Sequence, residues 1–208
     1  WRCPALCTVR HRATGHWFLP FPERVLTPLT QRTGGLTWLP ELLRWRASWI
    51  SELPQLPAAT VDATTLYCDG AVSFPSDAGL RRAVAAVAWV RDGVWHRWWG
   101  PAPQPASSGR AELWGVLAAI SLLDPAAAQL GARIVLDNQA VVAGLHQLQA
   151  AGGCCRRQQR AGPMGDLWEL AARSGLGDRR WRFDWVPGHC PRGRAADLGI
   201  SVDDWIGN

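Results

Sequence analysis

The order of strand and helix signals after residue 64 is the feature that most constrains the fold of this 208-residue chain. Three β-like segments come first, and Arg91-Asp92-Gly93 between the second and third is typical of a tight hairpin turn. The remainder alternates helix, strand, helices, strand and helix. This order predicts an α/β fold, a mixed five-stranded sheet whose first three strands are antiparallel, flanked by helices.

Apolar periodicity and cap residues set the expected boundaries of these elements. We expect strands over 64–72, 81–90, 94–99, 132–136 and 181–186. We expect helices over 108–123, 139–149, 164–173 and 194–205. Leu113, Val116 and Leu117 share one face of the first helix, which indicates that this face packs on the sheet.

Residues 1–62 differ in composition from the rest of the chain, because prolines and tryptophans are interleaved there without strand alternation. We interpret 1–62 as an irregular Pro/Trp-rich tether or connection segment, with one amphipathic helix near 39–50, and 63–208 as the folded domain. The chain shows no secretory signal. Its first residue is Trp1, which suggests a fragment of a longer polypeptide.

Composition excludes several classes of protein. With 48% apolar residues the chain can bury a sizeable core, which argues against wholesale disorder. The longest apolar stretch, Ala83–Val90, falls far short of the roughly 20 residues that span a bilayer, so we expect no membrane partner. The six cysteines are scattered, and the adjacent Cys154 and Cys155 are poorly placed for a disulfide framework. We therefore expect an intracellular protein, in the cytoplasm or the nucleus.

Four acidic residues stand where their charge can serve chemistry. Asp69 lies inside the first strand, where a carboxylate is desolvated unless it meets a cation or a donor. Asp137 ends the fourth strand and would approach Asp69 if the two strands are neighbours. Glu112 would reach in from the following helix, and Asp197 lies in the first turn of the last helix. Clustered carboxylates repel unless a divalent cation neutralises them, and four could hold two ions about 3.5–4 Å apart.

Three of these acids also fit a structural role. Glu112 and Asp197 would complement a helix dipole in a first turn, and Asp137 can cap the following helix. Asp69 has no equally good structural explanation. The functional hypothesis therefore depends most on Asp69.

Four blocks occur in order along the chain: YCDGA, SSGRAEL, VLDNQAVV and WVPGHCPRGRAADLG. Together they resemble the type 1 ribonuclease H domain, particularly that of reverse-transcribing retroelements, over about residues 63–205. The resemblance implies hydrolysis of the RNA strand of an RNA–DNA hybrid by two Mg²⁺ ions, for which Mn²⁺ can substitute. The products would carry a 3′-hydroxyl and a 5′-phosphate.

The resemblance also implies a role for each matching residue. Asp69 would bridge both metals, Glu112 and Asp137 would complete one metal site, and Asp197 would complete the other. His189 matches a loop histidine linked to proton transfer or product departure, a task that suits a group titrating near neutral pH.

The resemblance further implies contacts with the hybrid, whose 2′-hydroxyls distinguish RNA from DNA in a wide, shallow groove. The implied contact residues are Gly70, Ser107, Ser108, Gly109, Gln139, Arg156 and Arg157. All 22 basic residues are arginine, and the net charge of +5 suits a polyanionic partner. Further arginines are placed to meet phosphates, namely Arg110, Arg160, Arg192 and Arg194. An upstream reverse transcriptase segment is the other expected partner.

The sequence departs from the family pattern in one segment and at two single positions. Ser73–Gly79 replaces a glycine- and asparagine-rich turn, Asn138 stands in place of a small hydroxyl residue, and Gly193 stands in place of an asparagine. These departures keep an alternative open, a catalytically inactive ribonuclease H fold that binds nucleic acid or serves as a structural module of a retroelement polyprotein.

Overall fold

A computed structural model describes residues 9–11, 15–17, 54–73, 81–188 and 190–207. The chain divides into two compact units, Trp1–Leu53 and Pro54–Asn208. In the first unit, β1 (Val9–His11) pairs antiparallel with β2 (Gly15–Trp17), although the sequence pattern predicts no strand there. The helix predicted over 39–50 lies outside the described residues.

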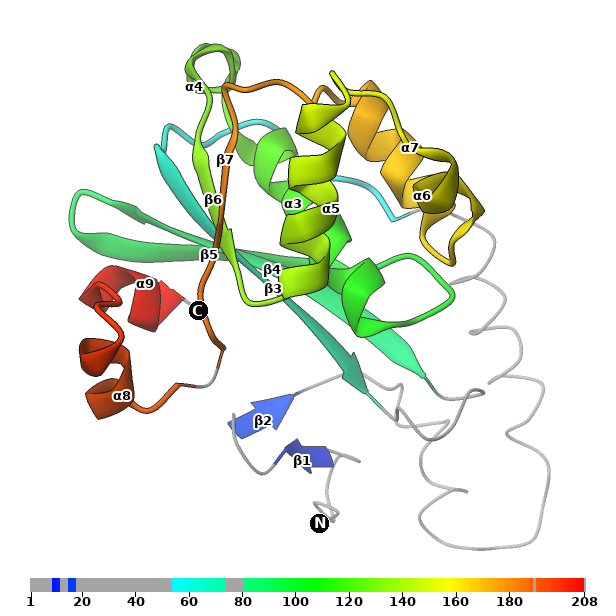
Figure 1. The fold of residues 1–208 in the computed structure, drawn as a ribbon. Helices are drawn as coiled ribbons and strands as arrows, with labels where there is room; N and C mark the ends of the chain where they lie inside the picture. Colours follow the sequence, from blue (N-terminus) through cyan, green and yellow to red (C-terminus); the bar gives the residue numbers. More distant parts are fainter. Residues whose placement is uncertain (1–8, 12–14, 18–53, 74–80, 189, 208) are drawn as a thin grey trace, which may run out of the picture. The chain divides into compact units, whose positions relative to one another are not determined.

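The second unit is built on a mixed five-stranded sheet of order β5-β4-β3-β6-β7 (Figure 1). Its strands are β3 (Thr65–Ser73), β4 (Arg82–Arg91), β5 (Val94–Pro101), β6 (Arg133–Leu136) and β7 (Arg182–Trp185). β3, β4 and β5 are antiparallel, whereas β6 runs parallel to β3 and β7 parallel to β6. The predicted sheet is therefore confirmed.

Helices lie on both faces of this sheet (Figure 1). They are α3 (Ser108–Leu122), α4 (Pro125–Leu130), α5 (Gln139–Ala150), α6 (Arg157–Ala161), α7 (Gly165–Arg173), α8 (Arg192–Asp197) and α9 (Val202–Gly207). The main core lies between the sheet and α3, α5 and α7, and a smaller cluster on the other face contains Tyr67, Val135 and Val186. Among the described helices, none is long and apolar enough to cross a membrane.

Residues just before the predicted domain boundary at 62 pair with the end of α3. The amides of Thr60 and Val61 both donate to the carbonyl oxygen of Leu122 at 2.8 Å. The hydroxyl of Ser121 donates to the carbonyl oxygen of Pro57, also at 2.8 Å. Residues 57–61 therefore belong to the second unit.

Close contact between α3 and β3 depends on glycine. A Cβ atom on Gly115 would lie 3.5 Å from the Cβ of Cys68, and one on Gly70 would overlap the backbone of Glu112. Because neither glycine carries a side chain, the helix backbone can lie directly against the central strand. This contact brings the side chain of Glu112 next to the middle of β3.

The single helix predicted over 194–205 is in fact two helices, α8 and α9. α8 ends because Gly199 adopts a left-handed conformation with φ of 69°. The amide of Ile200 then donates to the carbonyl oxygen of Ala195 at 2.9 Å, the bond of a Schellman motif. Asp197 is consequently the last residue of α8 and does not lie in a first turn.

Arg110 is part of the fold, which corrects the prediction that it meets phosphates. Its side chain is 3% exposed, and its two terminal nitrogens donate to the two carboxylate oxygens of Asp166 at 2.6 Å each. Two further bonds, each 3.0 Å long, reach the carbonyl oxygens of Gln104 and Pro163. This guanidinium therefore joins the start of α3 to the start of α7.

Replacing Arg110 by methionine should lower the free energy of unfolding by about 3 kcal/mol. That is the low end of the cost of breaking a buried ion pair, because Asp166 is half exposed and can be rehydrated. Urea unfolding at pH 7 measures the difference. Arg173→Met, which removes an exposed pair to Glu169 within α7, should leave the urea midpoint unchanged.

The same pair has a predicted pH dependence. The hydrogen bonds from Arg110 lower the pKa of Asp166. The stabilisation from the Arg110–Asp166 pair is therefore fully present above the ordinary aspartate pKa of about 3.9. It is lost as the pH falls through the lower pKa that Asp166 has in the folded state. If Arg110→Met and Arg173→Met lowered the free energy of unfolding equally, the structural role assigned to the buried Arg110 would be contradicted.

Candidate metal centre

The parallel pairing of β3 with β6 places two carboxylates next to each other. Cys68 pairs with Leu136 in this register, so Asp69 and Asp137, the next residue on each strand, lie side by side. The two strands are neighbours, as the sequence hypothesis requires. Asp69 lies within β3, and Asp137 follows the last residue of β6.

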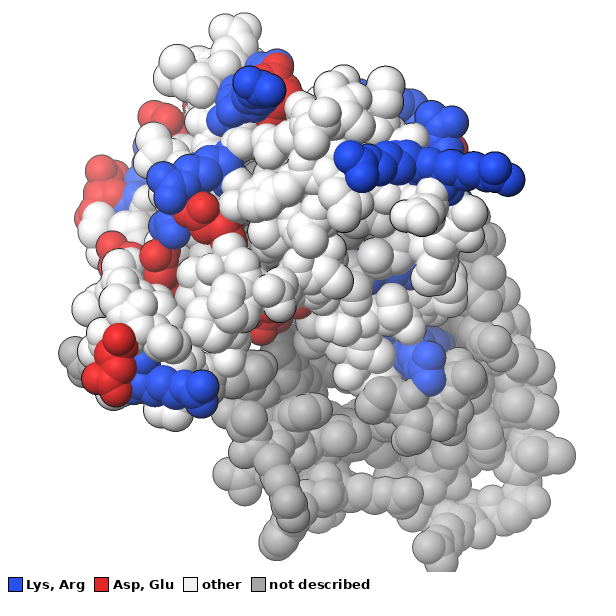
Figure 2. All heavy atoms as spheres, in the orientation of Figure 1, with Lys and Arg blue, Asp and Glu red and all other residues white. Residues whose placement is uncertain are grey.

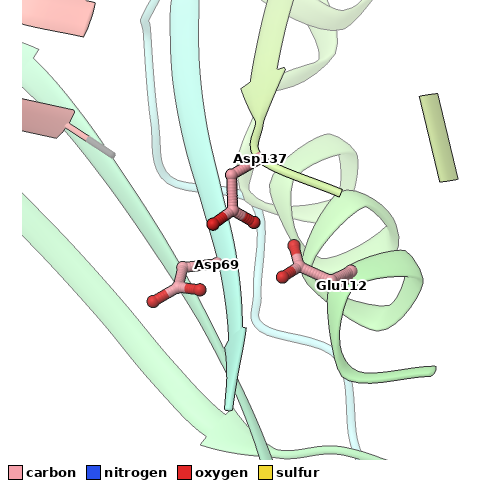
Figure 3. Close-up of side chains that lie close together, drawn as sticks. All are labelled: Asp69, Glu112 and Asp137. Carbon is pink, nitrogen blue, oxygen red and sulfur yellow. The ribbon is translucent and has the colours of Figure 1, made fainter. Parts of the chain in front are cut away.

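Glu112 completes a cluster of three carboxylates (Figure 3). Within the described residues, one oxygen from each of Asp69, Glu112 and Asp137 lies within 4.8 Å of the other two. Glu112 is 2% exposed, whereas the two aspartates are partly exposed. Glu112 lies beyond the first turn of α3, so the helix dipole does not explain its position.

Asp137 is held by its neighbours without serving as a helix cap. The side chain of Asn138 caps α5 by accepting from the amide of Val141 at 3.2 Å, which corrects the suggestion that Asp137 does so. The indole nitrogen of Trp185 donates to the carbonyl oxygen of Asp137 at 2.8 Å. A Cβ atom on Gly188 would overlap the carboxylate of Asp137, so a larger residue there would displace that carboxylate.

Trp185 and Gly188 are supporting residues that the sequence argument did not identify. The sequence signal for them was their place at and just after the end of the fifth strand, in the same block as His189. Their contacts show that the chain leaving β7 passes against Asp137.

The pKa of Glu112 is strongly raised within the cluster. Burial raises its pKa to about 9, with the negative charges of Asp137 and Asp69 and a hydrogen bond with Asp137 acting in the same direction. A hydrogen bond from the amide of Gly70 acts in the opposite direction. Without a cation, Glu112 is therefore protonated at neutral pH.

The cluster fits a divalent cation that prefers oxygen ligands. Oε2 of Glu112 is buried and has no hydrogen-bond partner within the described part of the chain. Three carboxylates supply the hard oxygen donors that Mg²⁺ and Mn²⁺ prefer, and a cation would offset the repulsion that raises the pKa of Glu112. Burial raises the pKa of the neighbouring Cys68 thiol, so it remains neutral and is a poor ligand.

The remaining catalytic predictions lie outside this cluster. Asp197 is exposed on α8 and is not among the described carboxylates that lie within 4.8 Å of one another. Its role as a fourth ligand stays a prediction. His189 is outside the described residues, although Gly188 before it contacts Asp137.

The predicted substrate contacts fall at helix starts and on α6. The hydroxyl of Ser107 caps α3 by accepting from an amide at 3.2 Å, and Ser108 and Gln139 are exposed first residues of α3 and α5. Gly109 instead lies against Met164, whose sulfur would be 3.1 Å from an added Cβ atom.

Arginine placement is more informative than the net charge. Arg156 and Arg157 are exposed at the start of α6, and Arg160 is exposed on the same helix. In the view of Figure 2, arginine predominates in the upper right, where α6 and α7 lie, whereas arginine and acidic residues are mixed on the left. The surface near α6 is therefore the more basic part of this face.

No protein-family model and no curated protein sequence matches the chain. Solved structures similar to it are ribonuclease H domains. The solution structure of the PFV ribonuclease H domain is 13% identical and covers 68% of this chain and 91% of its own, with a TM-score of 0.46. Ribonuclease H1 of the halophilic archaeon Halobacterium salinarum NRC-1 is 19% identical and covers 69% and 97%, with a TM-score of 0.40.

A foamy viral protease-reverse transcriptase in complex with an RNA/DNA hybrid is 16% identical. It covers 87% of this chain and 27% of its own, with a TM-score of 0.44. At these identities and TM-scores the evidence on chemistry has to come from this chain's own carboxylates.

Glu112 makes the metal-free protein less stable as the pH rises. Because its folded pKa is about 9 and the ordinary glutamate pKa is about 4.3, the folded state binds the extra proton between these values. The free energy of unfolding should therefore fall as the pH rises through this window. Glu112→Gln should reduce that fall, and chemical unfolding in EDTA from pH 5 to 9 measures it.

The matched control is Glu169→Gln, which changes an exposed glutamate on α7 in the same way. It should keep the wild-type pH dependence. Adding Mg²⁺ at pH 8 should stabilise the wild type and the Glu169 variant more than the Glu112 variant, because a cation that binds only the folded state raises its stability. Identical pH profiles for the wild type and Glu112→Gln would show that the proton is not on Glu112.

Proposed function

We propose that this chain is a metal-dependent endonuclease that hydrolyses the RNA strand of RNA–DNA hybrids. The observation that carries the proposal is the cluster of Asp69, Glu112 and Asp137, whose oxygens lie within 4.8 Å of one another. A buried glutamate with a pKa of about 9 is unfavourable for a purely structural site, and it is accounted for if a cation binds there. The four ordered sequence blocks supply the substrate class.

The three carboxylates would hold the first of two divalent ions, Mg²⁺ or Mn²⁺. When bound, two such metal ions would lower the pKa of a bound water and stabilise the negative charge that develops on the scissile phosphate. Glu112 would hold the ion as a carboxylate, with its proton released to solvent. Asp197 is the proposed additional ligand, and His189 is proposed to carry a proton or assist product departure. Cleavage would leave a 3′-hydroxyl and a 5′-phosphate.

The start of α3 and the start of α5 are the proposed contacts with the hybrid. Ser108 lies one helical turn before Glu112, and Gln139 lies two residues after Asp137, so both exposed side chains are close to the cluster along the chain. Ser107, Gly109 and Gly70 complete the proposed groove contact, although Gly70 and Gly109 also have packing roles. Hydroxyl and amide groups here suit the 2′-hydroxyls of an RNA strand.

Arg156 and Arg157 are proposed to meet phosphates farther along the duplex. α6 is attached to α5, because the side-chain amide of Gln159 donates to the carbonyl oxygen of Gly144 at 3.0 Å. The two exposed guanidinium groups therefore extend from an anchored helix. Binding through them weakens as salt is added.

We further propose that the domain acts inside the cell as part of a longer retroelement polyprotein, after a reverse transcriptase segment. The first unit, Trp1–Leu53, would then be the connection to that segment, since residues 57–61 belong to the second unit. The unit boundary and the Pro/Trp-rich composition before residue 62 support this part of the proposal.

The proposal predicts Mg²⁺-dependent cleavage of labelled RNA within an RNA–DNA hybrid, and little cleavage of double-stranded DNA or single-stranded RNA. Asp69→Asn should reduce the rate by at least about two orders of magnitude, because it removes a charge on which the cation site depends. Denaturing gels that resolve the labelled RNA products measure the rate.

The control is Asp62→Asn, which makes the same change at an exposed aspartate outside the cluster and should cleave at the wild-type rate. Hybrid binding without cleavage would instead favour a non-catalytic nucleic-acid-binding module. Undiminished cleavage by Asp69→Asn would contradict the assignment of the site.

A further inference from the structure

The C-terminal helix α9 docks on the face of the sheet opposite α3 through one buried acid. Asp204 is 8% exposed, and its two carboxylate oxygens accept from the two terminal nitrogens of Arg133 on β6 at 2.6 and 3.1 Å. The hydroxyl of Tyr67 on β3 also hydrogen-bonds to Asp204. A single aspartate of α9 is thus bound to both central parallel strands.

Arg133 is itself oriented by a second acid. Its Nε donates to Asp184 on β7 at 2.5 Å, and Arg182 donates to the same carboxylate at 3.1 Å. Because Nε is held by Asp184, the two terminal nitrogens point in a fixed direction toward Asp204. A planar guanidinium held in this way favours one position of α9.

This docking point lies next to Asp69, the member of the carboxylate cluster that shares a face of β3 with Tyr67. Side chains two residues apart on a strand share a face and are about 6.6 Å apart along it, so Tyr67 and Asp69 are neighbours on this face. A Cβ atom on Gly207 would overlap the ring of Tyr67, which places the end of α9 directly on that residue.

α8 is held at both ends while most of its own surface is exposed. The indole nitrogen of Trp205 on α9 donates to the carbonyl oxygen of Cys190 at 2.7 Å, just before α8 begins. After α8, only residues 198–201 lead to α9. Within α8, Ala195 is buried, whereas Arg194 and Asp197 are exposed.

We infer that Arg133, Asp204 and Tyr67 form a docking cluster that sets the position of α8 and thereby of Asp197 relative to the three central carboxylates. They are positioning residues, because none of them is a proposed metal ligand. The inference rests on the proposed function only in taking Asp197 to be the additional ligand. It assigns a specific task to an ion pair on the face of the sheet opposite α3.

Two measurements on Arg133→Met test the inference without an activity assay. Hydrogen exchange of residues 192–205 should become at least tenfold faster, with exchange in α3 unchanged. Calorimetric titration of the wild type with Mn²⁺ should show two sites. One of them should weaken at least tenfold in Arg133→Met and in Asp197→Asn, while the other keeps its affinity.

Arg182→Met is the matched control, because Arg182 donates to Asp184 and, among the described residues, makes no hydrogen bond or ion pair with α9. It should match the wild type in both measurements. If Arg133→Met does not fold, Tyr67→Phe is the second variant. It keeps the ring beneath Gly207, removes one bond to Asp204, and should change both readouts in the same direction by about threefold, the effect of a net hydrogen bond of modest strength.

Faster exchange with unchanged Mn²⁺ affinities would overturn the inference, since the cluster would then dock α9 without positioning Asp197. A wild type that binds one Mn²⁺ ion would also overturn it. A wild type that binds two Mn²⁺ ions in an Arg133-dependent way but cuts no hybrid would leave the inference standing and remove the proposed function.

Discussion

Repulsion among three carboxylates is the constraint on which the rest of this domain depends. One oxygen from each of Asp69, Glu112 and Asp137 lies within 4.8 Å of the other two, a distance at which three ionised carboxylates would repel one another. Three features prevent them from separating. They are the parallel register of β3 and β6, the glycine-mediated contact of α3 with β3, and the indole bond to the backbone of Asp137. The domain keeps a proton on Glu112 at neutral pH, and a divalent cation is the natural replacement for it.

Much of the fold and the centre of the site could be predicted from the sequence because they depend on local pattern. The strands and the central helices follow from apolar periodicity, and Asp92-Gly93 forms the expected hairpin turn with φ of 52° and 73°. An acid inside a strand and an acid at a strand end become neighbours when the strands are parallel, adjacent and in a matching register. The sequence could therefore predict that Asp69 approaches Asp137 if their strands are neighbours, and the register of β3 and β6 meets that condition.

The errors occurred where a competing partner or a backbone conformation, and not the apolar pattern, decides the outcome. Arg110 looked like a phosphate contact because it precedes an acidic ligand, but Asp166 takes its guanidinium group. Asp137 looked like a helix cap, but Asn138 is the cap. The predicted last helix breaks at Gly199, whose left-handed φ a periodicity argument ignores. In our inference the position of Asp197 depends on how α9 docks on the sheet, and no local sequence pattern encodes that docking.

The most direct test of the account is a crystal structure of the domain soaked in Mn²⁺, with an anomalous difference map. The account predicts a peak between Asp69, Glu112 and Asp137, with manganese–oxygen distances of about 2.0–2.3 Å, slightly longer than those of Mg²⁺. It also predicts loss of that peak in Asp69→Asn. The contradicting result would be no anomalous peak at the cluster in millimolar Mn²⁺, with Glu112 still hydrogen-bonded to Asp137. These carboxylates would then not form a metal site.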